Sequence, residues 1–300
     1  MQNSSPENNM LSSKLKHYFN NDIKLWSKSK DKIFIINKSD VFYQIDIYNE
    51  NISKFIENNE NSIIESMIAK DLCNKNIIDL SYGVHHYIAR TIDNKIYCWG
   101  NNCWSQLGNG RKDENAVQEN NSELNELLSD LNITVIKCGA YHSLALTQSG
   151  KVYAWGGNQW GQIGCGDNFD KSVPTKVKAL NEFKIKMISC GFNHSMALTE
   201  NGCVYSWGYN QFGRLGIGNT KNSNTPKQIQ MKDIIIDKIT CGDGHSLLLT
   251  SNGVIYAFGS NFFGEIGNGM QEHIEKPIKL NHEKKFIDIT SHCMAHISIA

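Results

Sequence analysis

Several stretches of the chain carry the residue types that nucleophilic or metal chemistry uses. In each, a cysteine precedes a histidine by four residues and a serine follows directly, as in Cys138, His142 and Ser143. A histidine beside a serine or cysteine can take the proton of a nucleophile, and a cysteine–histidine pair can hold zinc. Taken alone, such a stretch has the composition of an active site or a zinc site.

The stretch is not unique, which argues against a single active site. "CGAYHSLALT" at 138–147 is matched by "CGFNHSMALT" and "CGDGHSLLLT", and a looser copy, "YGVHHYIART", precedes them. The aligned histidines are His86, His142, His194, His245 and His296. They lie 56, 52, 51 and 51 residues apart. Self-similarity at a fixed period of about 50 residues is typical of a propeller or a repeat array.

Metal and catalytic chemistry explain the repeat poorly. Unless a turn intervenes, four strand steps separate a cysteine from its histidine by about 13 Å, whereas two ligands of one zinc lie about 4 Å apart. A catalytic triad needs one asymmetric arrangement, and no orienting carboxylate recurs at a fixed place. The glycine-rich ends match neither nucleotide-binding pattern. We therefore expect no enzyme activity, no metal and no cofactor, and we interpret the histidines as satisfying buried backbone groups within each blade.

Composition narrows the class of protein further. A chain of 300 residues with 40% hydrophobic content can bury a sizeable core. Basic and acidic residues each total 30, so the formal net charge is zero and nucleic-acid binding is disfavoured. No apolar run reaches the ~18 residues of a membrane span, and the start lacks a signal peptide. Nine cysteines without an export signal indicate reduced thiols, and hence the cytoplasm or the nucleus.

One repeat predicts three or four short antiparallel strands. "IKMISCG" alternates apolar and polar residues as a half-buried strand does, and "HSMALT" and "CVYSWG" follow as the next two strands. Between them, Gly150, Gly202 and Gly253 occupy a tight hairpin that needs a positive φ. Asn94 holds that place in the loose copy, and asparagine best tolerates this conformation after glycine. The pattern predicts an all-β fold, a β-propeller of four-stranded antiparallel blades.

Glycines and tryptophans mark the corners of each unit. Glycine at the end of the third strand permits a sharp bend and a close approach between neighbouring blades. These corner glycines are Gly100, Gly156, Gly208 and Gly259. The residue before each one is large and apolar, which favours packing between blades over ligand contact. These residues are Trp99, Trp155, Trp207 and Phe258.

The pattern C-G-x-x-H-S-x-A-L-T … G-x-V-Y-x-W-G-x-N-x-x-G-x-L-G-x-G resembles the repeats of the regulator of chromosome condensation family. "LSYGVHH", "YSWGYNQFGRLGIGN" and "SHCMAHISIA" look closest to members that join these repeats to a BTB domain. We expect units at about 77–131, 132–184, 185–235 and 236–285, with a partial unit at 286–300. Residues 23–76 look like a degenerate first blade, with Phe42 at the aligned tyrosine position and a short helix near 63–72. Residues 1–22 look disordered or irregular.

The resemblance implies an incomplete propeller, because the founding family closes seven blades and this chain holds about five and a half units. It also leaves two functions open. The first is a protein-interaction scaffold, as the substrate- or partner-binding propeller of a ubiquitin-ligase adaptor whose BTB domain is absent here. The second is guanine-nucleotide exchange on a Ran-like small GTPase. We favour the scaffold, because no contact residue of the exchange factor maps onto this chain.

Two further features are candidates for partner binding. The insertion at 110–132 places Leu124, Leu127, Leu128 and Leu131 at helical spacing, with Ser122 as a candidate N-cap. For this insertion we favour the alternative, a strand-connecting loop that packs a single helical turn on its own blade. An aromatic series lies four residues after the corner glycines. Its members are Trp104, Trp160, Phe212 and Phe263. Equivalent positions of successive blades lie on one arc, so these rings could form an aromatic track that anchors a partner. The alternative is that each ring covers the gap to the next blade.

Overall fold

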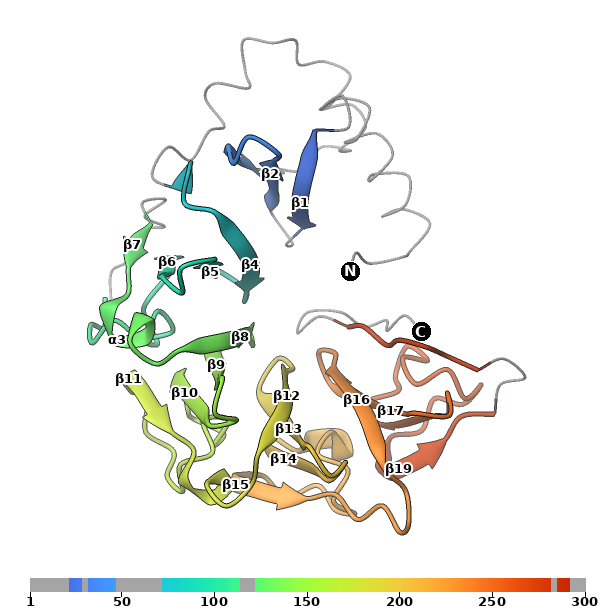
Figure 1. Ribbon diagram of the computed structural model, residues 1–300. Coiled ribbons are helices and arrows are strands. Elements are labelled where there is room, and N and C mark those ends of the chain that lie inside the picture. The colour runs from blue at the N-terminus through green and yellow to red at the C-terminus, as the bar shows by residue number, and fades with distance from the viewer. Residues whose placement is uncertain (1–21, 29–31, 47–71, 114–121, 282–284, 292–300) are drawn as a thin grey trace.

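The computed structural model describes residues 22–28, 32–46, 72–113, 122–281 and 285–291. Within these ranges the strands form antiparallel sheets set around a common centre, like the blades of a propeller (Figure 1). The predicted all-β propeller is therefore confirmed. None of the helices in the described ranges is long and apolar enough to cross a membrane.

The described part of the chain holds one three-stranded sheet and four four-stranded sheets. The first sheet consists of β1 (Ile23–Lys28), β2 (Lys32–Asn37) and β3 (Phe42–Asp46). Blade A consists of β4 (Ile77–Tyr82), β5 (His86–Thr91), β6 (Ile96–Gly100) and β7 (Glu123–Leu124). Blade B consists of β8 (Ile133–Cys138), β9 (His142–Thr147), β10 (Val152–Gly156) and β11 (Lys171–Lys176). Blade C consists of β12 (Ile185–Cys190), β13 (His194–Thr199), β14 (Val204–Gly208) and β15 (Ser223–Gln228). Blade D consists of β16 (Ile236–Cys241), β17 (His245–Thr250), β18 (Ile255–Gly259) and β19 (Ile274–Lys279).

The degenerate first unit forms a sheet of its own. Phe42 begins β3 and is fully buried, where it packs against Trp99 of blade A with ring centroids 6.1 Å apart. Three expectations fall almost wholly outside the described residues: residues 1–21 of the irregular segment, residues 63–71 of the expected helix, and residues 292–300 of the partial unit.

Each blade places its first strand nearest the centre, and neighbouring first strands contact one another (Figure 1). The second strands β9, β13 and β17 are buried along their whole length. Blades B and C each lie between two neighbouring blades, and Ile289 packs against blade D on the side away from blade C. The apolar core therefore lies between blades. One cluster, for example, joins Ile88 and Leu107 of blade A to Ile136 and Trp155 of blade B.

The backbone confirms the positive φ predicted for the hairpin positions and the sharp bend predicted for the corner glycines. The hairpin residues Gly150 and Gly202 have φ of 74° and 83°, and Asn94 has 64°. The corner glycines have φ between 98° and 109°, as the values for Gly100 and Gly259 show. A Cβ on Gly156 would lie 2.6 Å from the Tyr141 carbonyl oxygen, so no larger residue fits this corner.

The insertion contains the single helical turn expected of a connecting loop, but its N-cap differs from the prediction. Its helix, α3 (Glu126–Ser129), has one turn, and Asn125 is the N-cap, accepting a hydrogen bond from the Leu128 N–H. The assignment of Ser122 as N-cap was wrong, because residues 123–124 pair with β6 as β7 and delay the helix. Leu128 is buried between blades A and B, whereas Leu127 is exposed. Residues 114–121 lie outside the described part of the chain.

Turns between the first and second strands form a chain of backbone hydrogen bonds around the centre. Val84 N donates to Ala140 O at 3.2 Å, Ala140 N to Phe192 O at 3.0 Å, and Phe192 N to Asp243 O at 3.2 Å. Such close packing leaves no room beside the glycine that follows the repeat cysteine. A Cβ on Gly139 would lie 2.1 Å from His142 Cε1 and 2.8 Å from the Gly191 carbonyl oxygen.

We therefore predict that Gly139→Ala lowers the free energy of unfolding by about 3 kcal/mol, because the added methyl group displaces a buried ring and a neighbouring blade. Gly267→Ala is the control: no atom of the described residues lies within 4 Å of its Cβ position, and φ is +73°. Backbone strain alone should cost this variant about 1–2 kcal/mol. Equal midpoints for both variants in chemical denaturation would contradict the prediction.

Candidate functional site

The repeat histidines bind serines of the next blade, not groups of their own blade. His142 Nε2 lies 3.0 Å from Ser195 Oγ, although Ser143 is its neighbour in sequence. The same pairing joins His86 to Ser143 at 3.0 Å and His194 to Ser246 at 2.9 Å. The expectation of backbone partners within the blade was therefore wrong, because each partner lies one full repeat along the chain. All these side chains are fully buried.

The hydrogen-bond geometry assigns the proton in these pairs. Ser195 Oγ donates its only hydrogen to the Gln162 carbonyl oxygen at 2.9 Å, and Trp207 Nε1 donates to the same oxygen at 2.9 Å. His142 Nε2 must therefore carry a proton and donate it to Ser195 Oγ. A histidine in this tautomer cannot take a proton from the serine, so the pair is not a nucleophile with its base.

Burial fixes the ionisation of these groups. Desolvation lowers the pKa of His86 and of His142 to about 3, so both rings are neutral at physiological pH. Desolvation also raises the pKa of the Cys138 and Cys241 thiols to about 12, which keeps them protonated. A protonated, buried thiol is neither a nucleophile nor a metal ligand. Among the described residues, no group of three His, Cys, Asp or Glu side chains could hold a metal ion.

Tryptophan packing between blades is confirmed. Trp99, Trp155 and Trp207 are at most 2% exposed. A Cβ on Gly108 of blade A would lie 2.6 Å from the Trp155 ring of blade B, so the glycine rests directly on the indole. Gly164 meets Trp207 in the same way. The connections that carry these glycines are thereby held against the next blade.

A buried asparagine fixes each glycine-rich connection from inside. Asn158 Oδ1 accepts a hydrogen bond from the Ile163 N–H at 2.9 Å, and its Nδ2 donates to the carbonyl oxygens of Asp167 and Phe169. The equivalents Asn102, Asn210 and Asn261 are also fully buried and repeat this pattern. Sequence reasoning noted these asparagines only as position markers, although their strict recurrence was a signal of a structural role.

The aromatic series lies on these fixed connections, at one end of the blades. Trp104 is 42% exposed and Phe263 is 76% exposed, whereas Trp160 and Phe212 are half-buried. Trp160 contacts Tyr209 of blade C, with ring centroids 4.5 Å apart, and Phe212 contacts Phe262 of blade D at 5.1 Å. The structure therefore brings neighbouring rings together in pairs across blades. We call the end of the blades that bears these rings the aromatic face. Partner binding by the series stays a prediction.

Two rings of the aromatic face were missed from the sequence. Tyr209 precedes a buried asparagine, and Asn101 and Gly157 hold its place in blades A and B. Phe262 follows a buried asparagine, and Cys103 and Gln159 hold its place there. The repeat pattern therefore gave no sign of them.

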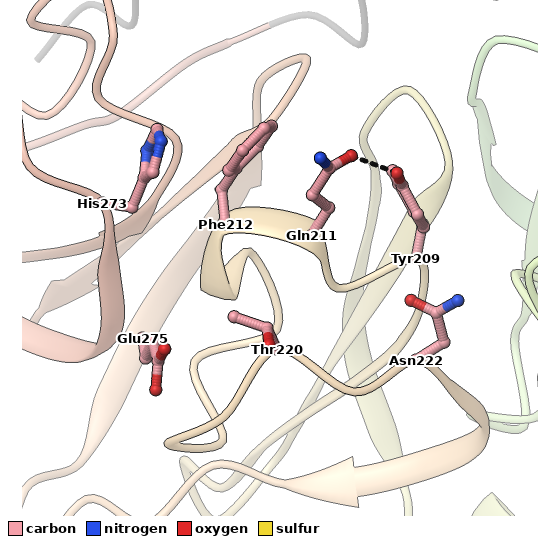
Figure 2. A pocket seen from close by; sticks show the side chains of 7 residues that line it. All are labelled: Tyr209, Gln211, Phe212, Thr220, Asn222, His273 and Glu275. Carbon is pink, nitrogen blue, oxygen red and sulfur yellow. Dashed lines mark hydrogen bonds between the residues drawn. The ribbon is translucent and has the colours of Figure 1, made fainter.

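The aromatic face is hollowed between blades C and D (Figure 2). This C–D hollow measures about 480 Å³. It is lined by Tyr209, Gln211, Phe212, Thr220, Asn222, His273 and Glu275. The first five side chains belong to the connection between β14 and β15, and His273 and Glu275 belong to blade D. The Tyr209 hydroxyl donates a hydrogen bond to Gln211 Oε1 at one side of the hollow, and the His273 ring faces Phe212 at the other (Figure 2).

A propeller of ~50-residue blades with these repeat positions defines a known class. Residues 54–300 match the model of the RCC1-like domain. The chain belongs to the RCC1-like domain family, which confirms the resemblance inferred from the repeats. The finer resemblance to BTB-joined members stays a prediction.

Several relatives are similar in sequence or in fold. Mouse HERC2, an E3 ubiquitin-protein ligase, is 31% identical over 245 residues, covering 78% of this chain and 5% of the relative. Human HERC4 is 32% identical over 210 residues, covering 69% of this chain and 20% of the relative. The chain thus spans a small part of each relative. Yeast RCC1 (Prp20), solved bound to Kap60, superposes with a TM-score of 0.71 at 20% identity, covering 87% of this chain and 61% of that one. Human WBSCR16 gives 0.73 at 19% identity, covering 90% and 69%.

The buried histidines predict how stability depends on pH. Their folded-state pKa lies below the ordinary value of 6.5, so the unfolded chain binds more protons as the pH falls below about 6.5. The free energy of unfolding is full above this pH and should fall toward pH 3, by up to about 1.4 kcal/mol per pH unit for each histidine. Urea titrations at about pH 7, 6 and 5 measure the slope.

The variant His142→Asn tests the origin of that slope. It removes one titrating ring, so the protein should be less stable at neutral pH and should lose less stability on acidification. A wild-type stability that stays constant between about pH 7 and 5 would show that the rings are not held neutral by the fold.

Proposed function

We propose that this chain is a non-enzymatic scaffold whose aromatic face holds a partner protein. The observation that carries the proposal is the exposure of large rings on connections that are themselves rigid. Trp104 and Phe263 are 42% and 76% exposed, yet each lies two residues after a fully buried asparagine. Tryptophan and other aromatic residues are the preferred anchors of protein interfaces.

Rigid presentation supports this function on energetic grounds. An anchor that is already ordered loses little conformational freedom when a partner binds, so more of its contact energy appears as affinity. The Trp104 backbone N–H donates to Gln106 Oε1 at 2.8 Å, and Leu107 N donates to Asn102 Oδ1 at 3.0 Å. Both bonds fix the loop on either side of the ring.

The family gives the scaffold a context. HERC2 is named as an E3 ubiquitin-protein ligase, and its similarity to this chain favours a propeller that holds substrates or partners for ubiquitin transfer. Because the chain covers 5% of that relative, ligase assembly belongs to the proposal alone. We propose the role of the substrate- or partner-binding propeller in a ubiquitin-ligase adaptor.

We expect Trp104→Ala and Phe263→Ala to weaken partner capture while changing the free energy of unfolding by less than about 1 kcal/mol. Trp155→Ala, which empties the core between blades, should instead cost about 3–5 kcal/mol. Quantitative affinity purification of the variants beside the wild type measures capture, and urea denaturation measures stability.

The matched control is Ile92→Ala. Ile92 is 71% exposed, but it lies in the β5–β6 hairpin at the opposite end of the blade from the aromatic face. If Ile92→Ala loses the partners and the two ring variants keep them, the binding surface is not the aromatic face. The wild-type chain could instead accelerate nucleotide release from a small GTPase. If both ring variants keep that activity, the exchange function is supported and the scaffold is not.

A further inference from the structure

Two rings of the aromatic series pack against a ring of the next blade, and Trp104 does not. Trp160 of blade B packs against Tyr209 of blade C, with ring centroids 4.5 Å apart. Phe212 of blade C packs against two rings of blade D, at 5.1 Å and 4.3 Å. Among the described residues no aromatic side chain packs against Trp104, which is 42% exposed. Within this part of the chain, the junction of blades A and B therefore presents an indole without an aromatic partner.

The sequence of blade B explains this difference. Blades C and D cover the preceding ring from three repeat positions, and none of these positions carries a ring in blade B. The covering residues Tyr209, Phe262 and His273 have as their blade B equivalents Gly157, Gln159 and Asp170. The backbone does not require glycine at the first of these positions, because Gly157 lacks the positive φ of the corner glycine Gly156 before it.

A side chain is sterically acceptable at Gly157. A Cβ there would lie 3.5 Å from Trp104 Cβ and 3.3 Å from the Tyr141 carbonyl oxygen, whereas a Cβ on Gly156 would lie 2.6 Å from that oxygen. Trp104 and Gly157 thus lie side by side, in the arrangement that blade C fills with a tyrosine ring. Blade C is consequently a template for what blade B lacks, a tyrosine ring beside the tryptophan.

We propose that Trp104 and Gln159 bind a tyrosine side chain of the partner. Its ring packs on the Trp104 indole as Tyr209 packs on its own tryptophan, in the tilted or offset arrangement that aromatic pairs prefer. Its hydroxyl donates to Gln159, since the Tyr209 hydroxyl donates to Oε1 of Gln211, the equivalent glutamine of blade C (Figure 2). Gln159 is exposed, and its side chain makes no hydrogen bond to the described residues.

The charge beside Trp104 favours a neutral ring over a cation. The Lys112 ammonium lies 5.7 Å from the centroid of the Trp104 ring and 3.4 Å from an oxygen of Asp170. It would repel an arginine or lysine of the partner, whereas a phenol carries no charge at neutral pH. The Lys112 side chain is 43% exposed, so it can move aside as a ring packs on the indole. The inference rests on the proposed scaffold, for which it names the chemistry of one anchor.

Small probes test this site without any partner protein. We use N-acetyl-tyrosine amide, N-acetyl-phenylalanine amide and N-acetyl-leucine amide, with ligand-observed saturation-transfer NMR on the 300-residue chain. The tyrosine probe should bind saturably, and the phenylalanine probe about fivefold more weakly, because it lacks the hydroxyl. The leucine probe, which has no ring, should not bind measurably. Equal binding of the tyrosine and leucine probes, or no saturable binding of any probe, would overturn the proposal.

Variants locate the binding. Trp104→Ala should reduce binding of the tyrosine probe below detection, whereas Phe169→Ala, which removes a 76% exposed ring outside the aromatic series, should leave it unchanged. Gln159→Ala should weaken the tyrosine probe about fivefold and leave the phenylalanine probe unchanged. Gln211→Ala, the same change in blade C, is the matched control. Unchanged binding in Trp104→Ala would overturn the assignment.

Gly157→Tyr supplies the ring from the chain itself. It should abolish binding of the tyrosine probe while the melting temperature stays at or above that of the wild type, because the new ring packs on Trp104. Gly157→Ala adds only the Cβ and should keep most of the binding. A folded Gly157→Tyr variant that binds the probe as the wild type does would overturn the proposal. If this variant does not fold, Trp104→Ala and Gln159→Ala decide the question.

The outcome is separable from that of the proposed scaffold. If the tyrosine probe fails to bind while the Trp104 and Phe263 variants lose their partner, Trp104 is not a tyrosine site and the scaffold stands. If the probe binds as expected while those variants keep every partner, the tyrosine site stands and the aromatic series is not the anchor.

Discussion

The propeller depends on a hydrogen-bond relay that crosses from each blade to the next, because no sheet ladder joins the blades. In one such step, His142 of blade B donates to Ser195 of blade C, and Ser195 returns a hydrogen bond to the Gln162 carbonyl of blade B. The Trp207 indole N–H ends on the same oxygen. Two donors of one blade thus meet one acceptor of its neighbour in a buried interface, where an unmade bond is costly. The step into blade D lacks the indole donor, since Phe258 stands there, but it keeps the bond from Ser246 to the Arg214 carbonyl at 3.0 Å.

The relay also holds the loops that form the aromatic face. The acceptor carbonyl lies in the glycine-rich connection, so the bond that joins two blades also fixes the loop that bears the exposed ring. The buried asparagine fixes the same loop from its own blade, as Asn158 does through Ile163 and Asp167. Rigidity at the aromatic face is therefore a consequence of how the blades are joined. A polar network that is fully buried and neutral supplies it, at the cost of sensitivity to protonation.

Periodicity made much of this fold predictable. Strand positions, hairpin turns and corner glycines depend on local backbone geometry, and the places of Gly150, Asn94 and Gly156 followed from the residue types alone. The partner of each histidine could not be inferred in this way, because His142 and Ser195 are 53 residues apart and only the packing of neighbouring blades brings them together. The N-cap of α3 was predicted wrongly for a different reason. Serine and asparagine are both good N-caps, and the pairing of β7 with β6 makes Asn125 the N-cap instead of Ser122.

The candidate sites are found at positions where one blade departs from the repeat. A position that is identical in every blade, such as the buried asparagine, is explained by the packing that every blade shares. The shared packing does not explain a position that differs in one blade. Such a position accompanies a local change in structure, as Arg214 accompanies the positive φ of Phe212. Gly157 stands where blade C places Tyr209 against a tryptophan, and Trp104 is left exposed beside it. In a repeat protein, the pattern therefore describes the scaffold, and the breaks in the pattern show where one blade can do something that its neighbours cannot.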